Sequence, residues 1–296
     1  LSSEVLNDYL AKEYVKRNLF NSRFVVDKSD KNTVLGIVSN TYSEYSNYNL
    51  INLLELNFLK YLKMFTINES YVINTRLYLR LLSDDIKVGS ITGYGGNGDD
   101  ISKVGLQIRN SMVGDSSVNI SYFIKRLICA NGLIVETSNS STRVFHRGKP
   151  KSFDKRLNEA ISGTYEGIDS VVKMLITLSE IPYNPNKLVD SGGVDLVYNI
   201  IPLKKNEIKE KKHFNKEEQL DFDKKIISSY PDKYSGSFSK KVFNSPHRDN
   251  ATMFDFVNIF TEYAHNKDIK TERRIDIEKN TGDFVRWVIE NKEKLL

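Results

Sequence analysis

Several kinds of residue are scarce in this 296-residue chain, and each scarcity excludes something. A single cysteine excludes an internal disulfide and fits a reducing compartment. The four histidines show none of the paired spacings of zinc motifs, so we expect no metal site. No long apolar run occurs and the mean hydropathy is -0.42, so the sequence predicts no transmembrane helix. The first twenty residues interleave charged and apolar positions, unlike a signal peptide, and we therefore expect a cytoplasmic protein.

Positive charge is modest overall but concentrated in one segment. The chain carries 43 Lys and Arg against 38 Asp and Glu, a formal net charge of +5. The segment from Ser141 to Arg156 alone reaches +5, because six cations stand there against Asp154 only. The six are Arg143, Arg147, Lys149, Lys151, Lys155 and Arg156. Such a basic strip on a nearly neutral protein has a directional field and can engage phosphates.

Hydrophobic periodicity predicts an α+β fold: an antiparallel sheet with a β-hairpin, packed by long helices. The pattern favours helices at 3–20, 50–65 (with Asn49 as cap) and 154–180. It favours strands at 24–26, 34–38, 71–82, 104–108 and 118–124, the last two forming the hairpin. This core domain would span residues 1–181.

The C-terminal part, residues 182–296, reads as mostly helical, and it can pack as one unit with the core domain. Pro182 and Pro185 indicate a linker at its start. A mixed-charge segment at 204–219 is typical of a solvated helix or a loop. Two helices, 252–265 and 282–290, are predicted near the end of the chain.

The predicted strand 71–82 carries a second candidate surface. Arg76, Tyr78 and Arg80 would share one face, and cations beside an aromatic ring suit the stacking of single-stranded bases. In the basic strip, Val144 and Phe145 would anchor the segment to the core. His146 is either a phosphate contact or a structural imidazole that ties the strip to the sheet.

Three further patterns allow a catalytic or binding interpretation that their sequence context disfavours. Gly93–Gly98 matches G-x-G-x-x-G, but two aspartates and a strand follow it, so we expect an interstrand loop without a nucleotide. Cys129 is interpreted as structural, with Asn131 or Gly132 taking a positive φ in a turn, rather than as a nucleophile served by His146. Asp195, Glu207 and Lys209 resemble the carboxylate–lysine set of Mg²⁺-dependent nucleases.

Four strings carry a family resemblance: LGIVSNTYSEYSNYNLINLL, IRNSMVGDSSVNIS, KRLICANGLIVETS and TRVFHRGK, followed by a long helix. In this order they resemble the phage- and plasmid-like proteins grouped as domain of unknown function 932. The likeness covers about Val34 to Trp287 and is weakest between Asn184 and His247. Many members have a histidine in the hairpin turn, where this chain has Met112 and Val113. The resemblance implies a mobile-element protein of the bacterial cytoplasm and no particular reaction.

Our leading hypothesis is a protein without catalysis or cofactor that binds single-stranded DNA or RNA in phage or plasmid replication or recombination, similar to annealing proteins. Its working surface would be the sheet face and the basic strip. A Mg²⁺-dependent nuclease and a structural or host-interaction protein are the alternatives. Self-association is left open, and no membrane partner is expected.

Overall fold

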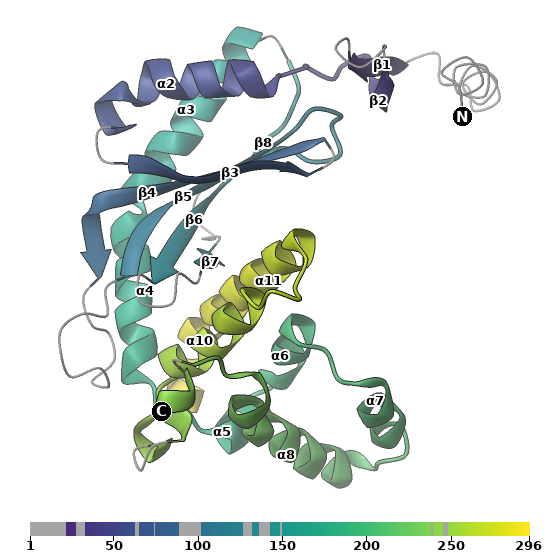
Figure 1. Cartoon of the computed structure of the whole chain (residues 1–296), viewed down its shortest axis with the longest axis vertical. Coiled ribbons are helices and arrows are strands. Elements are labelled where there is room, and N and C mark those ends of the chain that lie inside the picture. Colours follow the sequence, from purple (N-terminus) through teal and green to yellow (C-terminus); the bar gives the residue numbers. More distant parts are fainter. Residues whose placement is uncertain are drawn as a thin grey trace.

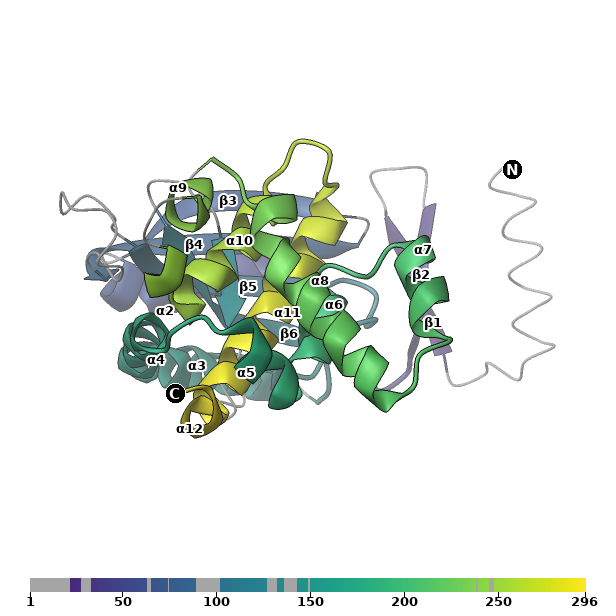
Figure 2. The same ribbon diagram turned by 90° about the horizontal axis from the view of Figure 1, so that it is seen from below.

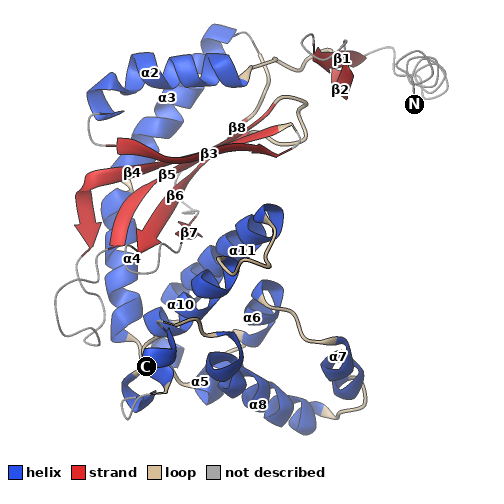
Figure 3. Ribbon diagram, viewed as in Figure 1, coloured by secondary structure: helices blue, strands red, loops and turns tan. Residues whose placement is uncertain are grey.

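The computed structural model describes most of the chain, in ten ranges. They are residues 22–27, 33–62, 65–73, 75–88, 102–126, 132–135, 143–148, 150–237, 239–244 and 248–296. The expected helix at 3–20 and the Gly93–Gly98 loop lie outside them. Figure 3 shows the strands gathered in one half of the molecule and only helices in the other, which confirms the α+β prediction.

An antiparallel sheet forms the centre of the first half, with strand order β3-β4-β5-β6-β7 and β8 paired to β6 (Figure 1). Alternation of apolar residues builds it: Val104, Leu106 and Ile108 are fully buried on one face of β5. A separate two-stranded ribbon, β1–β2, lies beside it. The strands are β1 Ser22–Asp27, β2 Thr33–Ser39, β3 Phe65–Ile73, β4 Arg76–Val88, β5 Ser102–Ser111, β6 Val118–Arg126, β7 Gly132–Val135 and β8 Arg143–Val144.

Helices cover both faces of the sheet. Helices α2 and α3 lie on one side and α10 and α11 on the other, and α11 separates the sheet from α6 and α8 (Figures 1 and 2). The helices before the charged segment are α2 Asn47–Leu62, α3 Pro150–Glu166, α4 Ile168–Glu180, α5 Pro185–Asp190 and α6 Val194–Ile200. The later ones are α7 Lys205–Lys211, α8 Lys216–Tyr234, α9 Ser239–Phe243, α10 Met253–Ala264, α11 Thr271–Glu290 and α12 Lys292–Leu295.

The predicted strand 71–82 is wrong as a single element. β3 ends at Ile73 and β4 begins at Arg76, and the two strands pair antiparallel, so that Tyr71 lies opposite Tyr78. The alternation of a single strand does not continue from β3 into β4, because Tyr71 shares a face with Tyr78 and not with Leu77. The preceding helix accordingly ends at Leu62, and Phe65 opens β3 rather than closing the helix. That helix also begins earlier than expected, where the Ser46 hydroxyl accepts a hydrogen bond from the Asn49 amide at 3.1 Å.

The predicted helix 154–180 is two helices, α3 and α4, separated at Gly167. A side chain at this position would place its Cβ 2.0 Å from the Tyr122 hydroxyl of β6, so the chain passes too close to the sheet for anything but glycine. The first of the two starts at Pro150, whose fixed φ suits the first helical turn.

The proline-containing segment 182–185 packs against the C-terminal helices. Pro182 forms a β-bridge with Thr252, and the Tyr183 ring stacks on Phe256 at a centroid distance of 4.4 Å. Pro185 begins α5, whose first turn is capped by Asn184. A continuous hydrophobic cluster joins the sheet to these helices, so the two halves share a core. Nowhere in the described ranges is a helix long and apolar enough to cross a bilayer.

Candidate nucleic-acid interface

A cavity of about 400 Å³ lies where β2, the β5–β6 turn and the segment after β8 meet. Its floor is buried and contains Val38, Tyr42 and His146. Its rim is exposed and contains Phe145 and Arg147. The other lining residues are Ile37, Ser39, Val113, Gly114, Asp115, Ser116 and Ser117. Three segments that are distant in sequence thus form one hollow, half apolar and half polar.

Gly114 allows the β5–β6 turn to close over the cavity floor. It has a φ of +71°, and a Cβ there would lie 2.8 Å from the Tyr42 ring. The Tyr42 hydroxyl donates a hydrogen bond to the Ser111 carbonyl at 3.1 Å, and burial raises the pKa of Tyr42 to about 12. The tyrosine is therefore a neutral, fixed wall of the cavity at physiological pH.

His146 is buried in the lining of the cavity. It is 4% exposed, and its ring lies against Tyr42 and Phe153, with centroid distances of 5.0 and 5.4 Å. Burial lowers its pKa, so the ring is neutral near pH 7. Nδ1 lies 3.2 Å from the Ser43 carbonyl, which can only accept, so Nδ1 carries the proton. Nε2 is then an acceptor, and it has no hydrogen-bond partner.

Among the described cations of the basic strip, Arg147 lines this cavity. The side chains of Arg143, Arg147 and Lys151 are exposed, and Lys149 lies outside the described residues. Arg156 donates from Nε to the Ser152 carbonyl at 3.2 Å and from Nη2 to the Arg147 carbonyl. The first turn of α3 contains no acidic residue, so its positive end adds to the strip rather than being neutralised.

Of the two residues expected to anchor the strip to the core, only Val144 is buried. Val144 is 3% exposed and packs into the core, whereas the Phe145 side chain is 59% exposed at the rim of the cavity. The two residues alternate because this stretch is a β-strand end, where neighbouring side chains point to opposite faces. The strip therefore presents an aromatic ring to solvent among its cations.

Arg76, from the second predicted surface, reaches the same end of the sheet. It forms an ion pair of 2.7 Å with Asp115, which lines the cavity. Burial alone would raise the pKa of Asp115, but hydrogen bonds from Arg76 and Ser111 hold it below its usual range. Arg109 also acts electrostatically on this carboxylate. Arg76 therefore reaches the rim of the cavity that Arg147 also lines.

Tyr78 and Arg80 do not line the cavity. We expected them to form an open stacking surface, but this expectation is wrong because both side chains are buried. Tyr78 is 5% exposed and Arg80 is 0% exposed, and Tyr78 packs in a hydrophobic cluster that includes Ile275 of α11. The Arg80 guanidinium lies 4.5 Å from the Phe123 ring centroid. The predicted sheet-face surface is thus an interior contact between sheet and helix.

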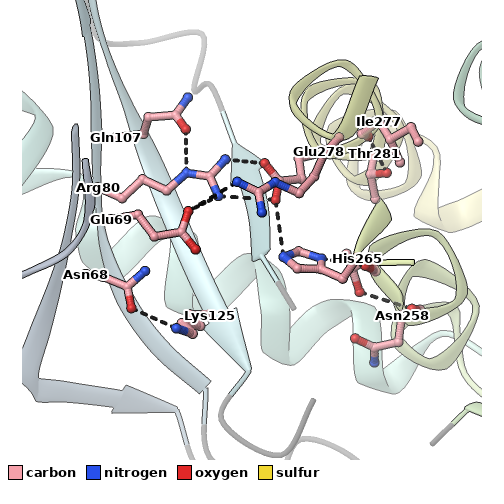
Figure 4. Close-up of polar contacts among 12 residues, drawn as sticks. Asn68, Glu69, Arg80, Gln107, Lys125, Asn258, His265, Ile277, Glu278 and Thr281 are labelled. Atoms are coloured by element: carbon pink, nitrogen blue, oxygen red, sulfur yellow. Dashed lines mark hydrogen bonds and ion pairs between the residues drawn. The ribbon is translucent and has the colours of Figure 1, made fainter. Parts of the chain in front are cut away.

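Arg80 is the centre of a buried polar network between the sheet and α11 (Figure 4). It forms hydrogen bonds and an ion pair with both carboxylate oxygens of Glu278, which is 0% exposed. It also pairs with Glu69 at 3.1 Å and donates to Gln107 at 2.9 Å. Burial raises the pKa of Glu278, and Arg80 opposes that rise. The network joins α11 to three strands.

His265 completes this network from the end of α10. Its Nδ1 donates to the Thr261 carbonyl at 2.9 Å, and its Nε2 lies 3.7 Å from Glu278. Burial lowers the pKa of His265, and the charges of Arg274 and Arg80 lower it further. The imidazole is therefore neutral at pH 7.

The predicted nuclease residues do not converge in a way that resembles a metal site. Glu207 accepts from the Lys204 amide at 2.8 Å, which caps α7, and pairs with Lys233 at 3.4 Å. Asp195 lies in the first turn of α6, and Lys209 is exposed on α7. Within the described ranges, no three histidine, cysteine, aspartate or glutamate side chains gather to hold one metal ion.

Gly132 is structural for a different reason from the one expected. It opens β7 without a positive φ. A Cβ there would lie 2.6 Å from the Phe123 ring and 3.0 Å from the Glu278 carboxylate, so close packing requires glycine. Cys129 and Asn131 lie outside the described residues.

Sequence reasoning missed Tyr42 and Asp115 in the cavity, and Glu69, His265 and Glu278 in the buried network. Asp115 stands in the turn segment that alternation and turn residues identified, so a local signal for its position existed. No local signal marks Glu278, because its partner Arg80 is 198 positions away in the chain.

Comparison with known proteins identifies a family for this chain. The model of the family described as domain of unknown function (DUF932) matches residues 34–284. No curated protein and no solved structure matches the chain. The matched residues include the cavity, the basic strip and the whole of the buried network.

Proposed function

We propose that this chain, which belongs to the DUF932 family, binds single-stranded nucleic acid at the basic strip around the cavity. The observation that carries the proposal is an exposed aromatic ring, Phe145, set between exposed cations at the positive end of α3. Proteins that bind single strands without sequence preference combine a basic path for the backbone with aromatic rings for the bases. We further propose that it works in the bacterial cytoplasm, in replication or recombination of a phage or plasmid.

The charges near the cavity support phosphate contacts. Arg147 and Lys151 are exposed, and neither has a carboxylate within ion-pair distance among the described residues. Asp154, the acid inside the strip, accepts a hydrogen bond from the Tyr45 hydroxyl at 2.7 Å, so it is directed to the core. Arg76 offsets Asp115 at the rim. The exposed Arg147 and Lys151 side chains are therefore available to phosphates.

Single strands suit this surface better than a duplex. The ring of Phe145 offers a flat apolar face, and only an unpaired base can stack on it without breaking a base pair. The buried sheet face, in contrast, leaves no second aromatic surface at Tyr78. The proposal therefore assigns the strand to the strip and not to the sheet.

The salt dependence of binding tests the location. We would replace Arg147, Lys149 and Lys151 together by alanine and measure binding of a labelled single-stranded oligonucleotide across a salt series. Each lost phosphate contact should reduce the slope of log K against log salt by about 0.7, so the triple variant should be flatter by about 2. Binding should weaken alike for every base composition, because phosphate contacts carry no sequence information.

A matched control removes the same charge elsewhere. Lys240, Lys241 and Lys267 are exposed at positions far from the strip in the sequence, and their triple alanine variant should keep the wild-type slope. An unchanged slope in the strip variant would place the binding surface elsewhere and refute the assignment. Equal loss of slope in both variants would indicate that only net charge matters.

A further inference from the structure

We propose that the cavity beside the strip takes one unpaired base of the bound strand, with the attached phosphate on Arg147. This inference rests on the proposed function and deepens it, because it names the unit that the site recognises. A surface that binds only phosphates needs no hollow, whereas this one leads to a buried floor.

The size of the cavity fits a single nucleotide. At about 400 Å³ it lies near the lower end of the range for ligand pockets, about 300 to 1,000 Å³. Apolar groups supply its walls: Ile37 from β2, Val113 from the β5–β6 turn and the Phe145 ring at the mouth. The Phe145 ring can stack on the face of a splayed base, and Ile37 and Val113 offer further apolar contact.

Polar groups within the cavity are left for a ligand. The Ser116 hydroxyl and His146 Nε2 are both buried and both without a hydrogen-bond partner. Buried polar atoms are normally paired, so two unpaired ones on the lining of one cavity point to a missing partner. His146 is 4% exposed, and its Nε2 is an acceptor because Nδ1 carries the proton that the Ser43 carbonyl accepts.

The edge of a nucleobase supplies what these groups require. An amino or ring N–H of the base can donate to His146 Nε2, and the Ser116 hydroxyl can either donate or accept. The Asp115 carboxylate on the rim accepts from a second amino hydrogen, and Arg147 remains for the phosphate. The cavity thus offers contacts for the face of a nucleobase, for its edge and for the attached phosphate.

The variant Phe145→Trp turns the site into a fluorescence reporter. The side chain is 59% exposed, so the larger ring is tolerated, and Trp287 is the sole native tryptophan. We would titrate this protein with single-stranded DNA, with single-stranded RNA and with an abasic DNA strand of equal length. The strands that carry bases should quench the new tryptophan, and the abasic strand should bind about five- to a hundredfold more weakly without quenching.

Ser117 offers a matched pair of variants for the cavity itself. Ser117→Leu fills the hollow without changing charge, whereas Ser117→Ala leaves it open. We expect the leucine variant, in the Phe145→Trp background, to lose quenching and to bind about five- to a hundredfold more weakly. The alanine variant should keep both properties. A thermal unfolding curve for each variant confirms that it is folded.

The outcomes separate this inference from the proposed function. Strand binding that keeps its salt slope but is indifferent to bases and to Ser117→Leu would overturn the base site and leave the strip intact. Absence of binding by any strand would overturn the proposed function and the base site together. Tyr48→Trp, which places a tryptophan on α2 at a residue 71% exposed, should show no quenching if the effect is local.

Discussion

Replacing Glu278 by glutamine should destabilise the protein far more than the loss of a single charge on its surface. Arg80 is 0% exposed and Glu278 is its main counter-ion, so the variant leaves a buried cation largely uncompensated. Removal of one partner of a buried ion pair costs about 3–5 kcal/mol. Glu69 remains 3.1 Å from Arg80 and is 31% exposed, so we expect the lower limit, about 3 kcal/mol.

Chemical and thermal denaturation measure this loss. For a chain of this size, about 3 kcal/mol corresponds to a Tm lower by roughly 6 °C. The control is Glu159→Gln, which makes the same chemical change in an exposed pair with Lys155. That pair has side-chain exposures of 79% and 64%, so its loss should cost under about 0.5 kcal/mol.

The comparison of the two variants can refute the reasoning. If Glu278→Gln costs no more than Glu159→Gln, then Arg80 does not depend on Glu278 and the buried network does not stabilise the contact of α11 with the sheet. A second variant, Arg80→Met with Glu278→Leu, removes both charges. It should recover part of the lost stability, because an apolar pair carries no desolvation penalty.

Three further predictions concern other parts of the fold and of its electrostatics. Gly282→Ala should lower the free energy of unfolding by more than about 3 kcal/mol, because a Cβ would lie 1.8 Å from the Ile134 carbonyl. Urea unfolding measures this loss, and a loss under about 1 kcal/mol would contradict the prediction. Gly163→Ala, with open space at its Cβ, should instead stabilise α3 by up to about 1 kcal/mol in the same assay. His265 has a lowered pKa in the folded state, so the unfolded chain binds the extra proton and the free energy of unfolding should fall as the pH drops below about 6.5. This slope should be shallower in His265→Gln, and an identical slope would show that His265 does not titrate with unfolding.

The parts of the fold that depend on neighbouring residues followed from the sequence. Alternation in 104–108 and 118–124, with turn residues between them, predicted the β5–β6 hairpin, which the pairing of Val104 with Ile124 confirms. The β1–β2 ribbon and α10 were predicted in the same way. Local pattern is sufficient there because the elements pair with their neighbours in the chain.

The features that the sequence did not predict depend on contacts between residues that are far apart in the chain. Arg80 and Tyr78 alternate like surface residues, and only the position of α11 decides that they are buried. The interruption at Gly167 depends on the Tyr122 hydroxyl of a strand more than forty positions earlier. The cavity likewise joins β2, the β5–β6 turn and the segment after β8. No single window of sequence contains these contacts.

Binding of wild-type protein to a labelled single-stranded oligonucleotide at about 50 mM salt tests the central claim most directly. The proposal predicts measurable binding that weakens linearly in log K against log salt, with a slope of at least about 2 that the strip variant reduces. Absence of binding to both single-stranded DNA and single-stranded RNA under these conditions would contradict the account.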